Sequence, residues 1–248
     1  MKEKSLLYGA TPVLQCLLNE NRQCFKLYYK EKSPTPRTRE IMQLANKRNI
    51  PVEKSDPHKL AALCNSKLHQ GVVLQCSELQ TYELDDFLEK IDRKEKKLLV
   101  ALDQIEDPQN CGAIIRSAAF LGVDGLITLK KNSAPLSASV SKASAGALEY
   151  LPIIQIGNLS EGLQFLKKEG FSVAGATSGE ESIDFVELPL TDYMVLVMGN
   201  EGQGLRKLTE KRCDFLIQIP GNDSTESLNV NAAAAILIHH LTRFNAIH

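Results

Sequence analysis

From residue 98 onward, short apolar runs alternate with longer segments whose apolar positions recur at helical spacing. The runs are rich in Val, Ile and Leu, and they predict strands at 98–102, 125–129, 152–156, 171–176, 193–198 and 214–219. The segments between them predict helices near 110–121, 137–145, 160–168, 205–210 and 230–244. Alternating strands and helices of this kind predict an α/β fold with a mostly parallel sheet and helices on both faces.

The first 76 residues show a different, more compact alternation. Helices are predicted near 11–18, at 37–48, and from Asp56 as N-cap through residue 64, with strands at 24–29, near Val52 and at 71–75. Such a module is large enough to fold by itself. Residues 77–97 are weakly helical and end in the charged run RKEKK, which is typical of a linker. The predicted domains are therefore 1–76, a linker at 77–97, and 98–248.

Charge is distributed unevenly between these parts. The net charge is −1, yet residues 1–76 carry 13 Lys and Arg against 6 Asp and Glu, a balance of +7, and the remainder has −8. A basic module joined to an acidic one fits an RNA-binding domain attached to a domain that performs chemistry. Charge alone leaves open a solvated basic face without a partner. Phe25, Tyr28 and Tyr29 could stack on bases, although core packing is the favoured interpretation for Phe25 and one tyrosine.

Membrane insertion, secretion and zinc binding are all disfavoured. No apolar run approaches the roughly 20 residues of a membrane span, and the start MKEKSLLYGA has no apolar signal region. The six cysteines are scattered without a CxxC pair, so we expect no metal site and free thiols in a reducing compartment. We expect a cytoplasmic protein, or a protein of the mitochondrial matrix if the source is eukaryotic.

Polar and glycine-rich segments follow three of the predicted strands. They are 103–118 (DQIEDPQNCGAIIRSA), 197–205 (VMGNEGQGL) and 219–236 (IPGNDSTESLNVNAAAAI). Because the carboxyl ends of parallel strands meet at one edge of a sheet, these segments predict a ligand crevice there.

The first segment offers an amide and a guanidinium. Asn110 stands where a helix N-cap belongs, and Arg116 follows inside an otherwise apolar helix. A guanidinium in an interior needs an anion or an acceptor, so Arg116 either serves a ligand or pairs with a core carboxylate. The residues alone leave both readings open.

The other two segments offer backbone and carboxylate groups. Glycines such as Gly199 allow close backbone approach to a ligand, and Glu201 is a carboxylate between glycines at a strand end. A turn-forming charge is the alternative for Glu201. Ser227, Leu228 and Asn229 precede an Ala-rich helix, so backbone N–H groups gather there in a way that suits a polar or anionic ligand.

In this order and spacing, the three segments resemble the three motifs of the SpoU (TrmH-like) branch of the SPOUT RNA methyltransferases. The resemblance covers about 150 residues. It implies a SPOUT-type sheet with a C-terminal trefoil knot, a homodimer formed through the C-terminal domain, and methyl transfer from S-adenosylmethionine to a ribose 2′-hydroxyl of RNA. No metal takes part, and neither DNA nor a membrane is an expected partner.

Two segments of the first 76 residues and a third at 132–149 add a second resemblance. LYGATPVLQCLL, HQGVVLQ and NSAPLSASVSKASAGALE are similar to segments of the subgroup that methylates guanosine in 23S rRNA and of its mitochondrial relative, which carry a ribosomal-protein-like substrate-binding domain. The implied substrate is therefore large-subunit rRNA, with a guanosine of the peptidyl-transferase P-loop expected as the target. A tRNA 2′-O-methyltransferase is the alternative substrate assignment.

The resemblance also assigns roles to individual residues. The implied catalytic residues are Asn110, Arg116, Glu201, Ser227 and Asn229. The implied cofactor-binding residues are Gly199, Ile219 and Leu228. Lys142 is the implied RNA contact. Arg116 is expected to activate the hydroxyl or to stabilise the developing alkoxide, since an arginine is a poor general base at its normal pKa.

This chain departs from the family's pattern at two positions. Asn231 stands where the family usually has Ser, which puts a local contact in doubt, and Cys111 stands where Phe is common.

Two other classes of function remain. A non-catalytic RNA-binding assembly factor would not need all five catalytic positions filled, as they are here. A dehydrogenase-like enzyme would need GxGxxG after its first strand, and DQIEDPQN stands there instead.

Overall fold

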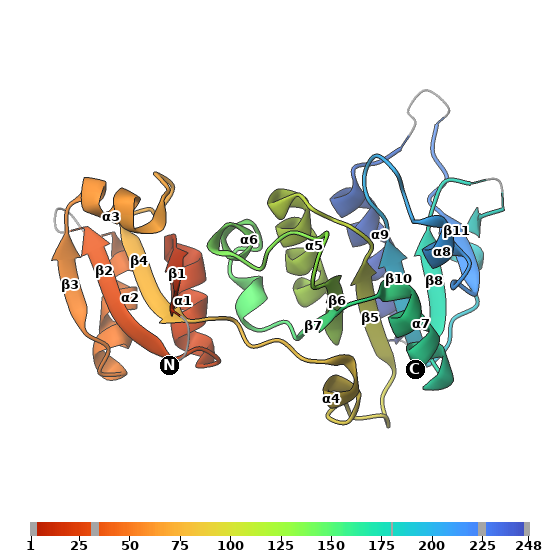
Figure 1. Ribbon diagram of the computed structural model, residues 1–248, viewed down its shortest axis with the longest axis horizontal. Coiled ribbons are helices and arrows are strands. Elements are labelled where there is room, and N and C mark those ends of the chain that lie inside the picture. The colour runs from red at the N-terminus through yellow and green to blue at the C-terminus, as the bar shows by residue number, and fades with distance from the viewer. Residues whose placement is uncertain (1–3, 31–34, 180, 223–226, 246–248) are drawn as a thin grey trace. The chain divides into compact units, whose positions relative to one another are not determined.

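The chain forms two compact units. The computed structural model describes residues 4–30, 35–179, 181–222 and 227–245. The first unit runs up to Gln80 and also takes Leu136–Tyr150, and the second comprises Thr81–Pro135 and the chain from Leu151 onward. Figure 1 shows the elements of each unit. No helix of the described residues is long and apolar enough to cross a membrane.

The first unit is built on a four-stranded sheet of order β1-β4-β2-β3. Its strands are β1 (Lys4–Tyr8), β2 (Cys24–Lys30), β3 (Val52–Ser55) and β4 (Val72–Ser77). Only β2 and β3 pair in parallel. Its helical segments are α1 (Ala10–Asn19), α2 (Pro36–Lys47), α3 (Pro57–Cys64), α6 (Ala138–Ala143) and the short 3-10 helix Ala147–Glu149.

Sequence patterning placed the helices of the first unit well. The Asp56 carboxylate caps α3 as predicted, because its Oδ1 accepts hydrogen bonds from His58 N at 2.9 Å and Lys59 N at 3.0 Å. Among the aromatic residues of β2, Tyr29 is buried, as core packing of one tyrosine predicts. Phe25 and Tyr28 are half-buried. Strand β1 was not predicted, since its place is set by pairing with β4, which lies more than 60 residues further along the chain.

The second unit is a seven-stranded sheet of order β7-β6-β5-β10-β8-β11-β9, and every pairing between its strands is parallel. The strands are β5 (Lys97–Leu102), β6 (Gly125–Leu129), β7 (Ile153–Ile156), β8 (Ser172–Ala176), β9 (Ile183–Asp184), β10 (Tyr193–Met198) and β11 (Phe215–Gln218). The predicted parallel α/β sheet is confirmed. Strand β9 has two residues, too few to leave an apolar pattern.

Helices cover both faces of this sheet. They are α4 (Leu84–Leu88), α5 (Pro108–Phe120), α7 (Leu159–Lys168), α8 (Lys207–Glu210) and α9 (Val230–Asn245). Helices α4 and α7 pack with alternate side chains of β5, β6, β8 and β10 in one hydrophobic core. Helices α5 and α9 lie side by side on the other face (Figure 1). Each helix thus buries an apolar stripe against the sheet.

The compact units and the predicted domains agree near residue 80 and differ elsewhere. Part of the predicted linker packs in the second unit, since Leu84, Phe87 and Leu88 of α4 are buried in its core. Leu136–Tyr150, which falls within the predicted domain 98–248, clusters with the first unit. The domain assignment stays a prediction, and so does the trefoil knot.

A buried ion pair fastens Leu136–Tyr150 within the first unit. Arg22 is 3% exposed and Glu149 2% exposed. Arg22 Nε donates to Glu149 Oε2 at 2.7 Å, and Ser141 Oγ donates to Glu149 Oε1 at 2.9 Å. The Glu149 carbonyl accepts from the Asn19 side chain at 2.7 Å. Buried charges require such complete pairing, so these contacts fix the segment's position.

Candidate functional site

The polar segments after β5 and β10 meet because their strands are neighbours in the sheet. Leu102 and Met198 are partners at the ends of the paired strands, and Asp103 N donates to Met198 O at 2.8 Å. Asp103 is fully buried, and its carboxylate accepts from Arg206 Nε at 2.7 Å and from Arg206 N at 3.0 Å. This ion pair joins the two segments at the carboxyl edge of the sheet.

The loop that follows β10 is a tight backbone ring closed between Asn200 and Gly204. Asn200 N donates to Gly204 O at 3.0 Å, and Gly204 N donates to Asn200 O at 2.8 Å. A Cβ atom on Gly199 would lie 2.3 Å from the backbone carbon of Gly204, closer than any side chain tolerates. Gly204 itself has φ +67°. Position 199 therefore requires glycine for the close approach, as the sequence indicated.

Glu201 lies at the centre of a network of amides. Its Oε1 accepts from Asn110 Nδ2 at 2.7 Å and from Asn229 Nδ2 at 2.7 Å. Asn110 Oδ1 in turn accepts from Asn231 Nδ2 at 3.2 Å, and Asn229 Oδ1 accepts from Asn231 N at 3.0 Å. The network joins the segments after β5, after β10 and at the start of α9. Glu201 thus contacts two other predicted catalytic residues, Asn110 and Asn229.

Asn110 does not cap its helix, contrary to the prediction. The N-cap of α5 is Asp107, whose Oδ1 accepts from Gln109 N at 3.0 Å, with Pro108 at the first helical position. Asn110 lies within the first turn, is buried, and donates to Asp107 Oδ2 at 3.1 Å. Asp followed by Pro is a sequence signal for a helix start that should have placed the cap at Asp107.

A pocket of about 440 Å³ opens beside this network. Its walls come from the end of β8, the loop after β10, β11 with the residues that follow it, and α9. The lining includes all three predicted cofactor-binding residues, Gly199, Ile219 and Leu228, together with Glu201 and Ser227. Asn110 and Asn229 do not line the pocket; they are linked to it by their hydrogen bonds to Glu201, which does.

The charges of the pocket select the kind of ligand that fits. Among the described residues that line it, the charged ones are Glu201 and Glu210, both acidic. A pyrophosphate-containing dinucleotide would meet carboxylates rather than cations in this pocket. A ligand with a positive centre and a flat heterocycle is complementary to the carboxylates and to the apolar side chains of Ile219 and Leu228. The described residues contain no group of His, Cys, Asp and Glu arranged to hold a metal ion.

Arg116 is exposed on α5, so the expectation of a guanidinium enclosed in an apolar interior is wrong. Its helical neighbours Ile114, Ile115 and Ala118 fill the core, whereas Arg116 occupies the outward position of the turn. Arg116 does not line the pocket, and no ion pair joins it to another of the residues that the structure describes.

Lys142 and Cys111, two further residues noted in the sequence, both contact other parts of the protein. Lys142 belongs to the first unit, where its ammonium donates to Leu68 O and lies 5.7 Å from the centre of the Tyr8 ring. Cys111, next to Asn110, is buried, and burial raises the pKa of its thiol to about 12. A thiol with so high a pKa is no nucleophile at neutral pH, which agrees with the structural role expected for Cys111.

Sequence reasoning missed two members of the site. Asn231 was noted only as a departure from the family's serine, and its contact with Asn110 could not be read from local spacing. Asp103 was not singled out, although its buried ion pair with Arg206 joins two of the site's segments.

Comparisons with known proteins identify both parts of the chain. The family described as SpoU rRNA Methylase matches residues 97–239, and the family described as RNA 2′-O ribose methyltransferase substrate binding matches residues 6–82. The chain is 37% identical to the 23S rRNA (guanosine-2′-O-)-methyltransferase RlmB of Neisseria meningitidis, over 98% of this chain and 96% of that protein. It is 32% identical to the putative TrmH family tRNA/rRNA methyltransferase YacO of Bacillus subtilis, over 98% and 96%.

Solved structures of related proteins share this fold. The crystal structure of an AdoMet-bound rRNA methyltransferase from Sinorhizobium meliloti superposes with a TM-score of 0.80 at 25% identity, covering 97% of this chain and 87% of that one. AviRb from Streptomyces viridochromogenes, a SpoU methyltransferase, superposes with a TM-score of 0.80 at 24% identity, over 98% and 91% of the two chains, and supports the fold.

Proposed function

Because the chain belongs to the SpoU rRNA methylase family, we propose that it transfers a methyl group from S-adenosylmethionine to the 2′-hydroxyl of an RNA ribose. The observation that carries this proposal is the pocket of about 440 Å³ whose charged lining is acidic and whose edge is the Glu201 network. A sulfonium is a cation, and the carboxylates of Glu201 and Glu210 complement it. The bound cofactor supplies an electrophilic methyl group.

Roles for individual residues follow from their places. Gly199, Ile219 and Leu228 line the pocket and would hold the adenosyl moiety through backbone groups and apolar contact. Asn110, Asn229 and Ser227 would orient the ribose and the cofactor around Glu201. Amide donors fixed in advance stabilise charge without rearranging during the reaction.

Arg116 would act on the ribose hydroxyl. In the reaction the 2′-oxygen bonds to the methyl carbon, the sulfur–methyl bond breaks with its electron pair remaining on sulfur, and the hydroxyl proton leaves to solvent. A guanidinium stabilises the negative charge that builds on that oxygen. Arg116 is exposed in this chain, so its side chain is accessible to an incoming RNA.

We assign a guanosine of 23S-type rRNA as the substrate. The relative from N. meningitidis is named as a 23S rRNA (guanosine-2′-O-)-methyltransferase. Residues 6–82 match a substrate-binding family of RNA 2′-O ribose methyltransferases. The excess of basic residues in 1–76 supports RNA contact by this part. Lys142, which belongs to the same compact unit, would add a further contact. The name of the B. subtilis relative leaves tRNA as the alternative. An enzyme acting on rRNA would work in the cytoplasm, or in the mitochondrial matrix of a eukaryote.

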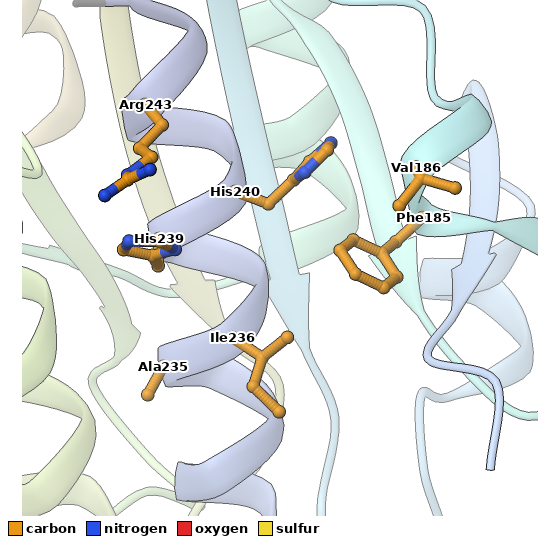
Figure 2. A pocket seen from close by; sticks show the side chains of 7 residues that line it. All are labelled: Phe185, Val186, Ala235, Ile236, His239, His240 and Arg243. Atoms are coloured by element: carbon orange, nitrogen blue, oxygen red, sulfur yellow. The ribbon is translucent and has the colours of Figure 1, made fainter.

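A homodimer formed through α5 and α9 completes the proposal. These helices pack together, and α5 leaves Phe120 87% exposed one turn after Arg116. On α9, Ile236, His239 and Arg243 line a groove of about 540 Å³ with Phe185 and Val186. Figure 2 shows His239 and Arg243 on one side of the helix and the ring of Phe185 facing His240. Isologous pairing would bury these apolar side chains.

Methyl transfer to defined RNAs tests the proposed activity. The full-length protein is incubated with S-adenosylmethionine labelled in the methyl group and with transcripts of 23S rRNA, 16S rRNA or tRNA. We expect label in 23S rRNA, recovered as 2′-O-methylguanosine. Label in tRNA alone would establish the alternative substrate. Binding of S-adenosylmethionine with no transfer to any RNA would indicate the non-catalytic factor.

The dimer is tested separately by light scattering and by complementation. An Arg116→Ala subunit mixed with a Gly199→Ala subunit should recover part of the activity if each site draws on both subunits. A fully active monomer would contradict the dimer and leave the methyl-transfer proposal intact.

A further inference from the structure

Three of the six cysteines come together in the core of the first unit, although they are far apart in the sequence. Cys16 lies on α1, Cys24 on β2 and Cys76 on β4. Cys16 and Cys76 are buried members of one hydrophobic cluster, and Cys24 packs against it. All three are free thiols. Neither the methyl-transfer site nor its cofactor pocket uses them.

Cys24 and Cys76 face each other across antiparallel strands. They are Cα partners in the pairing of β2 with β4, just before a register shift between Cys24 and Lys26. At the adjacent position Ser77 N donates to Gln23 O at 2.8 Å, so the two cysteines form a non-hydrogen-bonded pair. In such pairs the Cα atoms are about 4.5 Å apart and the side chains approach most closely. That separation lies within the range of about 4.4–6.8 Å that a disulfide spans.

The three thiols differ in reactivity. Cys24 is half-buried, whereas Cys16 and Cys76 are buried, so a small solute reaches Cys24 first. A hydrogen bond from the Cys16 thiol lowers the pKa of Cys24, and the guanidiniums of Arg48 and Arg22 lower it further against the effect of burial. The hydrogen bond to Cys24 also raises the pKa of Cys16. Cys24 is therefore the most exposed of the three thiols, and its lowered pKa favours the thiolate, which is the nucleophilic form.

We propose that Cys24 reacts with hydrogen peroxide and that Cys76 resolves the product into a cross-strand disulfide. The Cys24 thiolate attacks a peroxide oxygen, the O–O bond breaks, and hydroxide leaves, giving a sulfenic acid. The Cys76 sulfur then attacks the Cys24 sulfur, the S–O bond breaks, and the second oxygen leaves as water with the Cys76 proton. Two thiols are oxidised, and one peroxide is reduced to two waters. A dithiol reverses the reaction by thiol–disulfide exchange.

Peptide mapping of the native protein tests this directly. The full-length protein is treated with hydrogen peroxide, its remaining thiols are alkylated, and its proteolytic peptides are measured by mass spectrometry. We expect one cross-link, between the Cys24 and Cys76 peptides, which disappears when the oxidised protein is treated with dithiothreitol. A cross-link from Cys24 to Cys16 instead, or no cross-link, would overturn the assignment.

Variants separate the two steps. Cys76→Ala should form the sulfenic acid at Cys24, trapped by dimedone, with complete loss of the cross-link. Cys24→Ala should lose both the cross-link and the dimedone adduct. Cys64→Ala is the matched control, because Cys64 is also half-buried but lies on α3, outside the pairing of β2 with β4, and it should leave the cross-link unchanged. Dimedone labelling of Cys64 rather than Cys24 in the wild-type protein would refute the proposal even if a variant fails to fold.

Discussion

Asn110 donates a 2.7 Å hydrogen bond to the carboxylate of Glu201, although 91 residues separate them in the chain. The bond forms because β5 and β10, the strands that precede these residues, are neighbours in the parallel sheet. Asn229 donates to the same oxygen at 2.7 Å, so one carboxylate holds amides from two other segments. The geometry of the site therefore depends on Glu201.

Removing the amide of Asn110 should weaken methyl transfer without unfolding the enzyme. Hydrogen bonds to charged groups contribute about 1.5–3 kcal/mol, so Asn110→Ala should lower kcat/KM by on the order of 10- to 100-fold. In a double-mutant cycle with Glu201→Gln the two losses should not add, because both variants remove the same contact. Additive losses would show that the two side chains act independently.

Asn231 is expected to position Asn110. Its amide donates to Asn110 Oδ1 at 3.2 Å and leaves the Asn110 NH₂ group directed to Glu201 and Asp107. Asn231→Ala should lower kcat several-fold, because Asn110 loses the hydrogen bond that fixes its orientation. Such a hydrogen bond contributes about 1 kcal/mol. Asn231→Ser, which restores the family's residue and a shorter donor, should be less affected. Equal kinetics for all three proteins would remove Asn231 from the mechanism.

The two glycines of the loop after β10 should respond differently to alanine. A Cβ at Gly199 would lie 2.5 Å from the backbone nitrogen of Leu205, whereas a Cβ at Gly202 would meet only the Asn200 side chain at 3.8 Å. Gly199→Ala should therefore abolish binding of S-adenosylmethionine by displacing the loop, and Gly202→Ala should bind with nearly unchanged affinity. Isothermal titration calorimetry measures both. Tight binding by Gly199→Ala would show that the pocket does not hold the cofactor.

Arg116→Ala should abolish methyl transfer and leave cofactor affinity close to that of the wild type, because Arg116 is exposed and does not line the pocket. Arg116→Lys should recover only part of the activity, since an ammonium lacks the planar fork of donors that a guanidinium offers. Single-turnover transfer and calorimetry separate the two effects. Wild-type turnover by Arg116→Ala would exclude the residue from the chemistry.

Arg22→Ala should destabilise the protein strongly. Removing one partner of a buried ion pair leaves an uncompensated charge and costs about 3–5 kcal/mol. Glu149 would be that charge, since it is 2% exposed and accepts from Arg22 at 2.7 Å. Arg37→Ala is the control, because its pair with Glu40 is exposed and should contribute about 0–1 kcal/mol. Urea unfolding followed by circular dichroism compares the two variants. A similar midpoint for both would mean that the buried pair is dispensable.

Local patterns in the sequence predicted most of the elements and the edge of the sheet where the ligand pocket lies. Apolar periodicity is a local property, so it gave the six longer strands of the parallel sheet and the helices between them. Glycine and carboxylate positions after those strands pointed to Gly199 and Glu201, and the family resemblance added Ile219 and Leu228; all four line one pocket. The two unpredicted strands, β1 and β9, take their places from pairing with β4 and β11.

Tertiary structure alone decided which distant side chains meet. The contact of Asn231 with Asn110 and the opposition of Cys24 and Cys76 follow from packing and strand register, which no local pattern encodes. The place of Leu136–Tyr150 in the first unit depends on burying Glu149 against Arg22, residues that are 127 positions apart. Arg116 looked enclosed because its sequence neighbours are apolar, but helical geometry turns it outward while those neighbours face the core. Local sequence sets the period of each element, and long-range packing sets what each side chain touches.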